Sequence, residues 1–193
     1  MRTRSFVNPV LIVILMTLIL SACTAERTWS PYMELDDPDS EMLVLEDLPA
    51  TTEWEEKNNT YHEPGSCKKR TVVFKAANAR WIGNTVSLCV DPVGAEISAP
   101  STDNWGFSNL VWEEIPLSQF GLADIGESSK MWKTVAADKG IIKTNILMLV
   151  FHQNNAIVEL SILADMLEDA PDIELIHQLG QAIASRLPEP PAK

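Results

Sequence analysis

The residue types best suited to covalent chemistry in this chain are its three cysteines, Cys23, Cys67 and Cys89. Cys23 directly follows the small residues Ser21 and Ala22, and Leu20 ends the apolar run before them. A cysteine thiolate is a strong nucleophile, so it can form a thioether bond to a lipid. The other two cysteines are an even pair, which indicates a disulfide closing a loop of about 23 residues in an oxidising compartment. The alternative for this pair is two free thiols.

The residues around Cys23 have the pattern of a secretory leader. Arg2 and Arg4 are basic, and the apolar run 10–20 is shorter than the roughly 20 residues that a bilayer span needs. Leu20-Ser21-Ala22-Cys23 resembles the lipobox of bacterial lipoproteins. The resemblance implies cleavage after residue 22 and a diacylglyceryl thioether on Cys23, often with a further palmitate-type acyl chain on the new amine. Two acyl chains anchor a protein stably where one does not. The alternative is an ordinary signal peptide, or an uncleaved membrane helix, with an incidental cysteine.

Length and charge bound the mature chain and exclude one class of partner. Removal of the first 22 of 193 residues leaves 171, which suffices for one domain with a hydrophobic core. Loss of Arg2 and Arg4 leaves 13 basic and 27 acidic residues, a net charge of −14. Nucleic acid repels such a chain and is excluded as a partner. The membrane is expected to be reached through lipidated Cys23, on the outer face of the cytoplasmic membrane or in the outer membrane of the cell envelope.

An acidic tether is expected between the anchor and the domain. Prolines at 31 and 38 break regular structure there, and acidic residues dominate. The alternative is a cation site at Asp36, Asp37, Asp39 and Glu41, although the ligand order of an EF-hand loop is absent. The expected organisation is a signal peptide at 1–22, a tether at 23–40, a single domain at 41–188 and a tail at 189–193.

Hydrophobic patterns predict an α+β domain in which helices pack on an antiparallel β-sheet. Strands are expected at 70–74, 85–90, 131–136, 143–152 and 156–163, the last three as an antiparallel meander. The segment 70–74 could also begin a helix. Gln153-Asn154-Asn155 is the expected hairpin turn, because asparagine tolerates the left-handed conformation. A short helix is expected at Ser40–Leu48, and a C-terminal amphipathic helix at Asp172–Leu187 should cover one sheet face.

Several segments carry a resemblance to a known family. They are Leu45-Glu46-Asp47-Leu48-Pro49 with Trp54, the step Gly126-Glu127-Ser128, the hairpin 149–160 and the final helix. Their order resembles the PsbP-like, sensor-type extracytoplasmic domains of bacterial lipoproteins over residues 40–188, most weakly between 55 and 120. Members often carry Gly-Asp-Glu-Ser where this chain has Ile125-Gly126-Glu127-Ser128, so the aspartate is missing or displaced to Asp124. The resemblance implies an antiparallel sheet packed by helices and no catalytic residues.

Motifs for catalysis and metal binding are absent from the sequence. The histidines at 62, 152 and 177 lack the paired spacing of a zinc site. No Gly-x-Ser-x-Gly elbow and no P-loop occurs, so no catalytic residue, metal ligand or cofactor is predicted. The candidate binding surface is Trp105, Phe107 and Trp112, because aromatic side chains on a loop offer large contact area at low entropic cost. The alternative is that these tryptophans pack in the core.

These features predict a membrane-anchored, non-enzymatic module that binds a small molecule or an envelope protein. One alternative is a structural or assembly lipoprotein that acts through protein contacts. Another is a hydrolase of the envelope using a carboxylate pair such as Glu113-Glu114, although any acidic protein offers such pairs.

Overall fold

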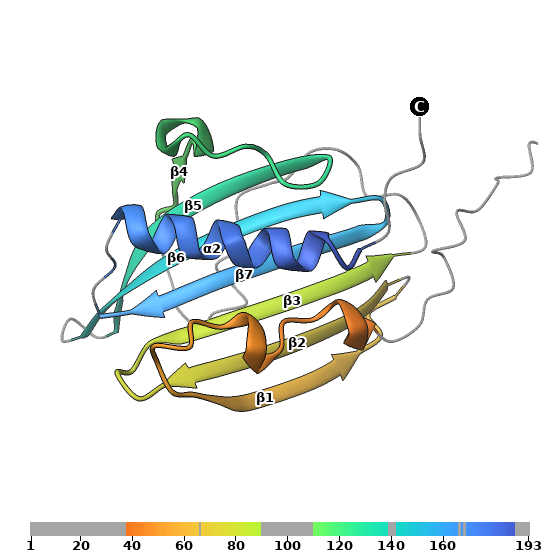
Figure 1. The fold of residues 1–193 in the computed structure, drawn as a ribbon, viewed down its shortest axis with the longest axis horizontal. Helices are drawn as coiled ribbons and strands as arrows, with labels where there is room; N and C mark the ends of the chain where they lie inside the picture. The colour runs from red at the N-terminus through yellow and green to blue at the C-terminus, as the bar shows by residue number, and fades with distance from the viewer. Residues whose placement is uncertain are drawn as a thin grey trace, which may run out of the picture. The chain divides into compact units, whose positions relative to one another are not determined.

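One antiparallel sheet organises the residues that the computed structural model describes, which are 38–65, 67–89, 110–138, 142–165, 167 and 169–187. Its strands are β1 (Trp54–His62), β2 (Cys67–Ala76), β3 (Trp81–Cys89), β4 (Glu113–Ile115), β5 (Ser128–Asp138), β6 (Ile142–Gln153) and β7 (Ala156–Ala164). Their spatial order is β1-β2-β3-β7-β6-β5-β4 (Figure 1), and every neighbouring pair is antiparallel. The helix α2 (Asp169–Ala184) lies over β6 and β7. The predicted antiparallel sheet with a C-terminal helix on it is confirmed.

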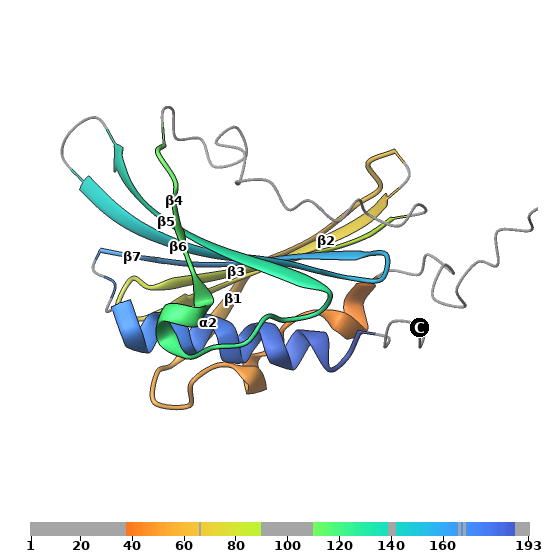
Figure 2. The same ribbon diagram turned by 90° about the horizontal axis from the view of Figure 1, so that it is seen from above.

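The sheet has two faces with different cover. The 3₁₀ helices η2 (Pro38–Glu41) and η3 (Leu45–Asp47) lie on the same side as α2, as Figure 2 shows with the sheet edge-on. This side is the helix face, and the opposite side is the far face. Alternation along β7 follows this division. Val158, Leu160 and Ile162 are fully buried on the helix face, whereas Glu159 and Ser161 lie on the far face.

The C-terminal helix buries the stripe that the sequence predicted. Ile173, Ile176, Gly180, Ile183 and Leu187 are all buried. The helix begins at Asp169, three residues before the predicted start, and ends at Ala184, with Leu187 in the turn that follows. A Cβ atom added at Gly180 would lie 2.8 Å from Leu149 Cδ2, so the missing side chain lets α2 approach the sheet closely.

The predicted helix at Ser40–Leu48 is wrong. The chain forms η2 and η3 instead, and Leu45, which the pattern placed on the buried stripe, is 45% exposed. The backbone N–H of Leu43 donates to the side-chain Oδ1 of buried Asn84 at 3.0 Å. In a helix capped by Ser40 this N–H would belong to the first turn and would bond to the cap side chain. It bonds to β3 instead, so contact with the sheet overrides the helical pattern. The 3₁₀ helix η5 (Leu117–Phe120) adds buried Leu117 to the same core.

The strand predictions are correct for the meander β5-β6-β7 and for the positions of β2 and β3, although the real strands are longer. The hairpin turn lies at Asn154-Asn155, where Asn154 has φ 58° as expected for a left-handed residue. The strands β1 and β4 were not predicted. β1 is an edge strand whose residues 55–59 are all exposed, so it lacks the alternation that identifies a half-buried strand.

The predicted disulfide between Cys67 and Cys89 is present, with an S–S distance of 2.09 Å. The two cysteines face one another in the register of β2 and β3, at the ends of the strands. The bond therefore closes the β2–β3 hairpin opposite its turn.

Gly126 is a position where a side chain should be strongly destabilising. Its φ is +65°, and a Cβ there would lie 2.4 Å from the carbonyl oxygen of His152. Left-handed backbone alone costs roughly 1–2 kcal/mol for a residue with a side chain. We expect Gly126→Ala to lower the free energy of unfolding by about 3 kcal/mol, measured by chemical denaturation. Gly121→Ala is the matched control, because Gly121 has φ +69° and open space around it. Equal losses in the two variants would contradict the role given to the His152 contact.

The disulfide should contribute measurably to stability. We expect the double variant Cys67→Ser/Cys89→Ser to lose roughly 3 kcal/mol of unfolding free energy, because the cross-link restricts the unfolded chain. The wild-type protein in reductant should match the variant. Labelling of either native cysteine by a thiol reagent before reduction would show that the bond does not form in solution.

Candidate functional site

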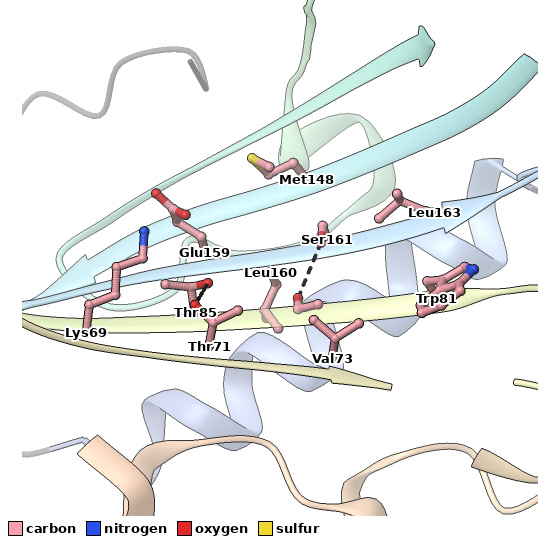
Figure 3. Close-up of a pocket in the computed structure, with 11 residues that line it drawn as sticks. Lys69, Thr71, Val73, Trp81, Thr85, Met148, Glu159, Leu160, Ser161 and Leu163 are labelled. Atoms are coloured by element: carbon pink, nitrogen blue, oxygen red, sulfur yellow. Dashed lines mark hydrogen bonds between the residues drawn. The ribbon is translucent and has the colours of Figure 1, made fainter. Parts of the chain in front are cut away.

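The far face of the sheet is hollowed where β3 pairs with β7 (Figure 3). The cavity volume is about 300 Å³, and the residues that line it are Lys69, Thr71, Val73, Trp81, Gly83, Thr85, Met148, Glu159, Leu160, Ser161 and Leu163. Ligand sites begin at about this volume, so the space suits a small molecule. We call this cavity the far-face hollow.

The hollow exists because the smallest residues meet at its centre. Gly83 and Ser161 are register partners on β3 and β7, flanked by Val73 on β2 and Met148 on β6. The Ser161 hydroxyl donates to the Gly83 carbonyl at 3.4 Å, and a Cβ at Gly83 would lie 2.8 Å from that hydroxyl oxygen. Glycine inside a strand marks a place where another group approaches the backbone closely. Here it leaves the floor of the hollow bare.

One end of the hollow is polar. The register aligns Thr71, Thr85 and Glu159 across β2, β3 and β7, and Lys69 lines the same end (Figure 3). The two threonine hydroxyl oxygens lie 2.9 Å apart and share one hydrogen bond. This end therefore offers hydroxyl, ammonium and carboxylate groups to a ligand.

The other end of the hollow is apolar. Trp81 and Leu163 are register partners, and Val73 lies beside them. The ammonium group of Lys75 lies 4.8 Å from the centroid of the Trp81 ring, a cation–π contact that restrains the ring. The hollow thus offers a polar end and an apolar wall, both on rigid strands.

Neither charged group of the hollow has an ionic partner in the part of the chain that the structure describes. Lys69 and Glu159 are half-buried, and among the described residues neither forms an ion pair. Other charges of the same sheet are paired, as Arg70 is with Asp39 at 3.3 Å. A half-buried charge without a partner loses hydration and gains nothing in return. A ligand could supply the missing partners.

A second polar cluster lies on the far face at the ends of β5 and β6. His152 is 3% exposed, and its Nδ1 lies 3.6 Å from the Glu127 carboxylate. Ser128 is its register partner on β5. The two ring nitrogens of His152 have no hydrogen-bond partner in the described part of the chain, and the same is true of the Ser128 hydroxyl. An activated serine needs a hydrogen bond to its base, and Ser128 and His152 form none in the described part of the chain.

The structure places only one residue of the predicted binding surface. Trp112 packs beside Trp132, Met148 and Val150 on the far face, and its indole nitrogen is buried without a partner among the described residues. Trp105, Phe107 and the predicted lipidation site Cys23 lie outside the described residues. The surface as a whole therefore stays a prediction.

The described part of the chain contains no cluster of side chains that could bind a metal ion. No three His, Cys, Asp or Glu side chains lie close enough there to hold an ion. Asp39, one of the carboxylates considered for a cation, pairs with Arg70 instead. Asp36 and Asp37 lie outside the described residues.

The far-face hollow is not evident from the sequence, although two local signals mark it. Gly83 interrupts an otherwise alternating strand, and Glu159 and Ser161 occupy alternate positions in an apolar strand. Their meeting depends on the pairing of β3 with β7, which local patterns do not reveal.

Comparison with known proteins adds no assignment. No protein-family model, no curated protein and no solved structure matches this chain significantly. In the described residues, no helix has the length and apolar character needed to cross a membrane. Function therefore has to be argued from the chemistry of the hollow.

Proposed function

We propose that this chain is a membrane-anchored extracytoplasmic module that binds a small ligand in the far-face hollow and catalyses no reaction. The proposal is carried by Lys69 and Glu159, two charges without an ionic partner among the described residues, beside an apolar wall formed by Trp81. Sites built on strands hold their groups more rigidly than sites on loops. Rigid walls with unsatisfied groups favour recognition of a ligand.

The lipobox at 20–23 and the disulfide support the extracytoplasmic part of the proposal. Disulfides persist in oxidising compartments, and Cys67–Cys89 links two strands that line the hollow. The net negative charge keeps the domain off an anionic lipid surface, so the anchor would have to come from acylated Cys23.

A structural or assembly lipoprotein is the second candidate. Val111 is 83% exposed and Val135 is 53% exposed, and both line one depression of about 470 Å³ beside β4 and β5. Exposed apolar side chains that lie together favour a protein contact.

Replacement of the anchoring cysteine tests the membrane part. We expect Cys23→Ser to release the protein into the soluble fraction or to leave an uncleaved precursor, because serine cannot accept the thioether-linked lipid. Membrane fractionation and the mass of the mature chain are the measurements. The double variant Cys67→Ser/Cys89→Ser is the control and should stay in the membrane fraction. Unchanged processing and fractionation of Cys23→Ser would refute lipid anchoring at this residue.

Filling the hollow tests the binding part. A broad small-molecule screen should yield ligands that raise the melting temperature and change tryptophan fluorescence. We expect Gly83→Val in a Ser161→Ala background to weaken such ligands at least about tenfold, which is 1.4 kcal/mol, because the added methyl groups occupy the floor. Ser161→Ala alone, which removes the hydroxyl near the new Cβ, is the matched control. It measures the loss of the hydroxyl without filling the floor and should bind more tightly than the double variant.

The fluorescence signal locates the ligand. Trp81→Phe should abolish most of the change, whereas Trp54→Phe should not, because Trp54 contacts the core on the helix face. If the screen yields no ligand and the protein crosslinks to a partner at the depression lined by Val111, the binding module would be replaced by the structural or assembly lipoprotein.

A further inference from the structure

We propose that the ligand of the far-face hollow is a small zwitterion with an apolar side chain, such as a free apolar amino acid. The inference rests on the proposed function, because it names the ligand class of the same site. It is carried by the arrangement of two opposite charges, a hydroxyl pair and an apolar wall.

The two charges lie on the same end of the hollow but on different strands. Lys69 comes from β2 and Glu159 from β7, with β3 between them (Figure 3). Neighbouring strands lie about 4.8 Å apart, so these two backbones are about 10 Å apart. No ion pair joins the two side chains. A ligand group that lies between the two side chains could therefore contact both.

A ligand with one charge would satisfy only half of this site. A carboxylate could pair with Lys69 but would be repelled by Glu159, and an amine would meet the reverse. A zwitterion supplies an anion to the ammonium group and a cation to the carboxylate. Charge complementarity at both groups therefore selects against singly charged analogues as well as for the zwitterion.

The threonine hydroxyls support binding of the ligand's charged end. The bond between Thr71 and Thr85 uses one donor and one acceptor, so one hydroxyl hydrogen stays available for a ligand oxygen. Beyond the hydroxyls, Val73, Trp81 and Leu163 form the apolar wall. A side chain of the size of leucine or phenylalanine would bury its apolar surface there.

Four matched probes separate the contributions of the two charges. They are L-phenylalanine, its N-acetyl derivative without the cation, its amide without the anion, and the neutral N-acetyl amide. Binding to the mature lipidated protein in detergent is measured by calorimetry and by tryptophan fluorescence. We expect L-phenylalanine to bind at least about tenfold more tightly than each of the other three.

Two variants then assign each charge to one side chain. Lys69→Met should bring L-phenylalanine down to the affinity of its amide, because the anion loses its partner. Glu159→Gln should bring it down to the affinity of the N-acetyl derivative. Lys68→Met and Glu114→Gln are the matched controls and should preserve the preference, because neither residue lines the hollow.

The outcomes distinguish this inference from the function on which it rests. Equal binding of the four probes, blocked by Gly83→Val in the Ser161→Ala background, would overturn the zwitterion and leave a binding module. The same holds if none of the probes binds while the broad screen yields a ligand that this variant blocks. Failure of both the probes and the screen would overturn the inference and the proposed function together.

Discussion

The pairing of β3 with β7 is the interaction on which the rest of the structure depends. It joins residues 81–88 to residues 156–163 and turns two separate meanders into one sheet. The cover of the helix face depends on it, because α2 lies over β6 and β7 while η2 packs on β2 and β3. Two arginines form ion pairs that link the parts of the helix face on either side of the β3–β7 pairing. Arg186, just beyond α2, pairs with Asp47 and donates to the Met42 carbonyl at 2.7 Å, and Arg80 pairs with Asp172 near the start of the helix.

The register of this pairing also determines what each face can do. Along β7 the large residues 158, 160 and 162 enter the core, whereas Glu159 and Ser161 face the hollow. A slip of one residue would exchange the two sets, placing a carboxylate in the core and residues 158, 160 and 162 on the far face. Buried Asn84 lies between Gly83 and Thr85 on β3, and it accepts the Leu43 N–H from the other side. The same strand therefore holds the N-terminal segment on one face and shapes the hollow on the other.

Local patterns predicted the parts of the fold whose signals are local. The meander and α2 have strong periodicity. Asn154 marks the hairpin turn between β6 and β7. The helix predicted at 40–48 does not form because the Leu43 N–H bonds to a side chain 41 residues away. No local pattern contains that contact. The hollow could not be predicted for the same reason, since Gly83 and Ser161 are 78 residues apart in sequence. β1 could not be recognised because an exposed edge strand buries too little to impose alternation.

The hollow collects several features that stability alone would disfavour. Glycine within a strand costs roughly 0.5–1 kcal/mol relative to alanine. Beside it, two half-buried charges have no ionic partner among the described residues. Natural sequences depart from locally favourable choices mainly at functional sites. The polar cluster at His152 also departs from them, but the His152 ring nitrogens and the Ser128 hydroxyl are buried in the sheet. In the hollow, Lys69 and Glu159 have no ionic partner among the described residues, and they line a cavity that a ligand can enter. The hollow is therefore the stronger assignment of function.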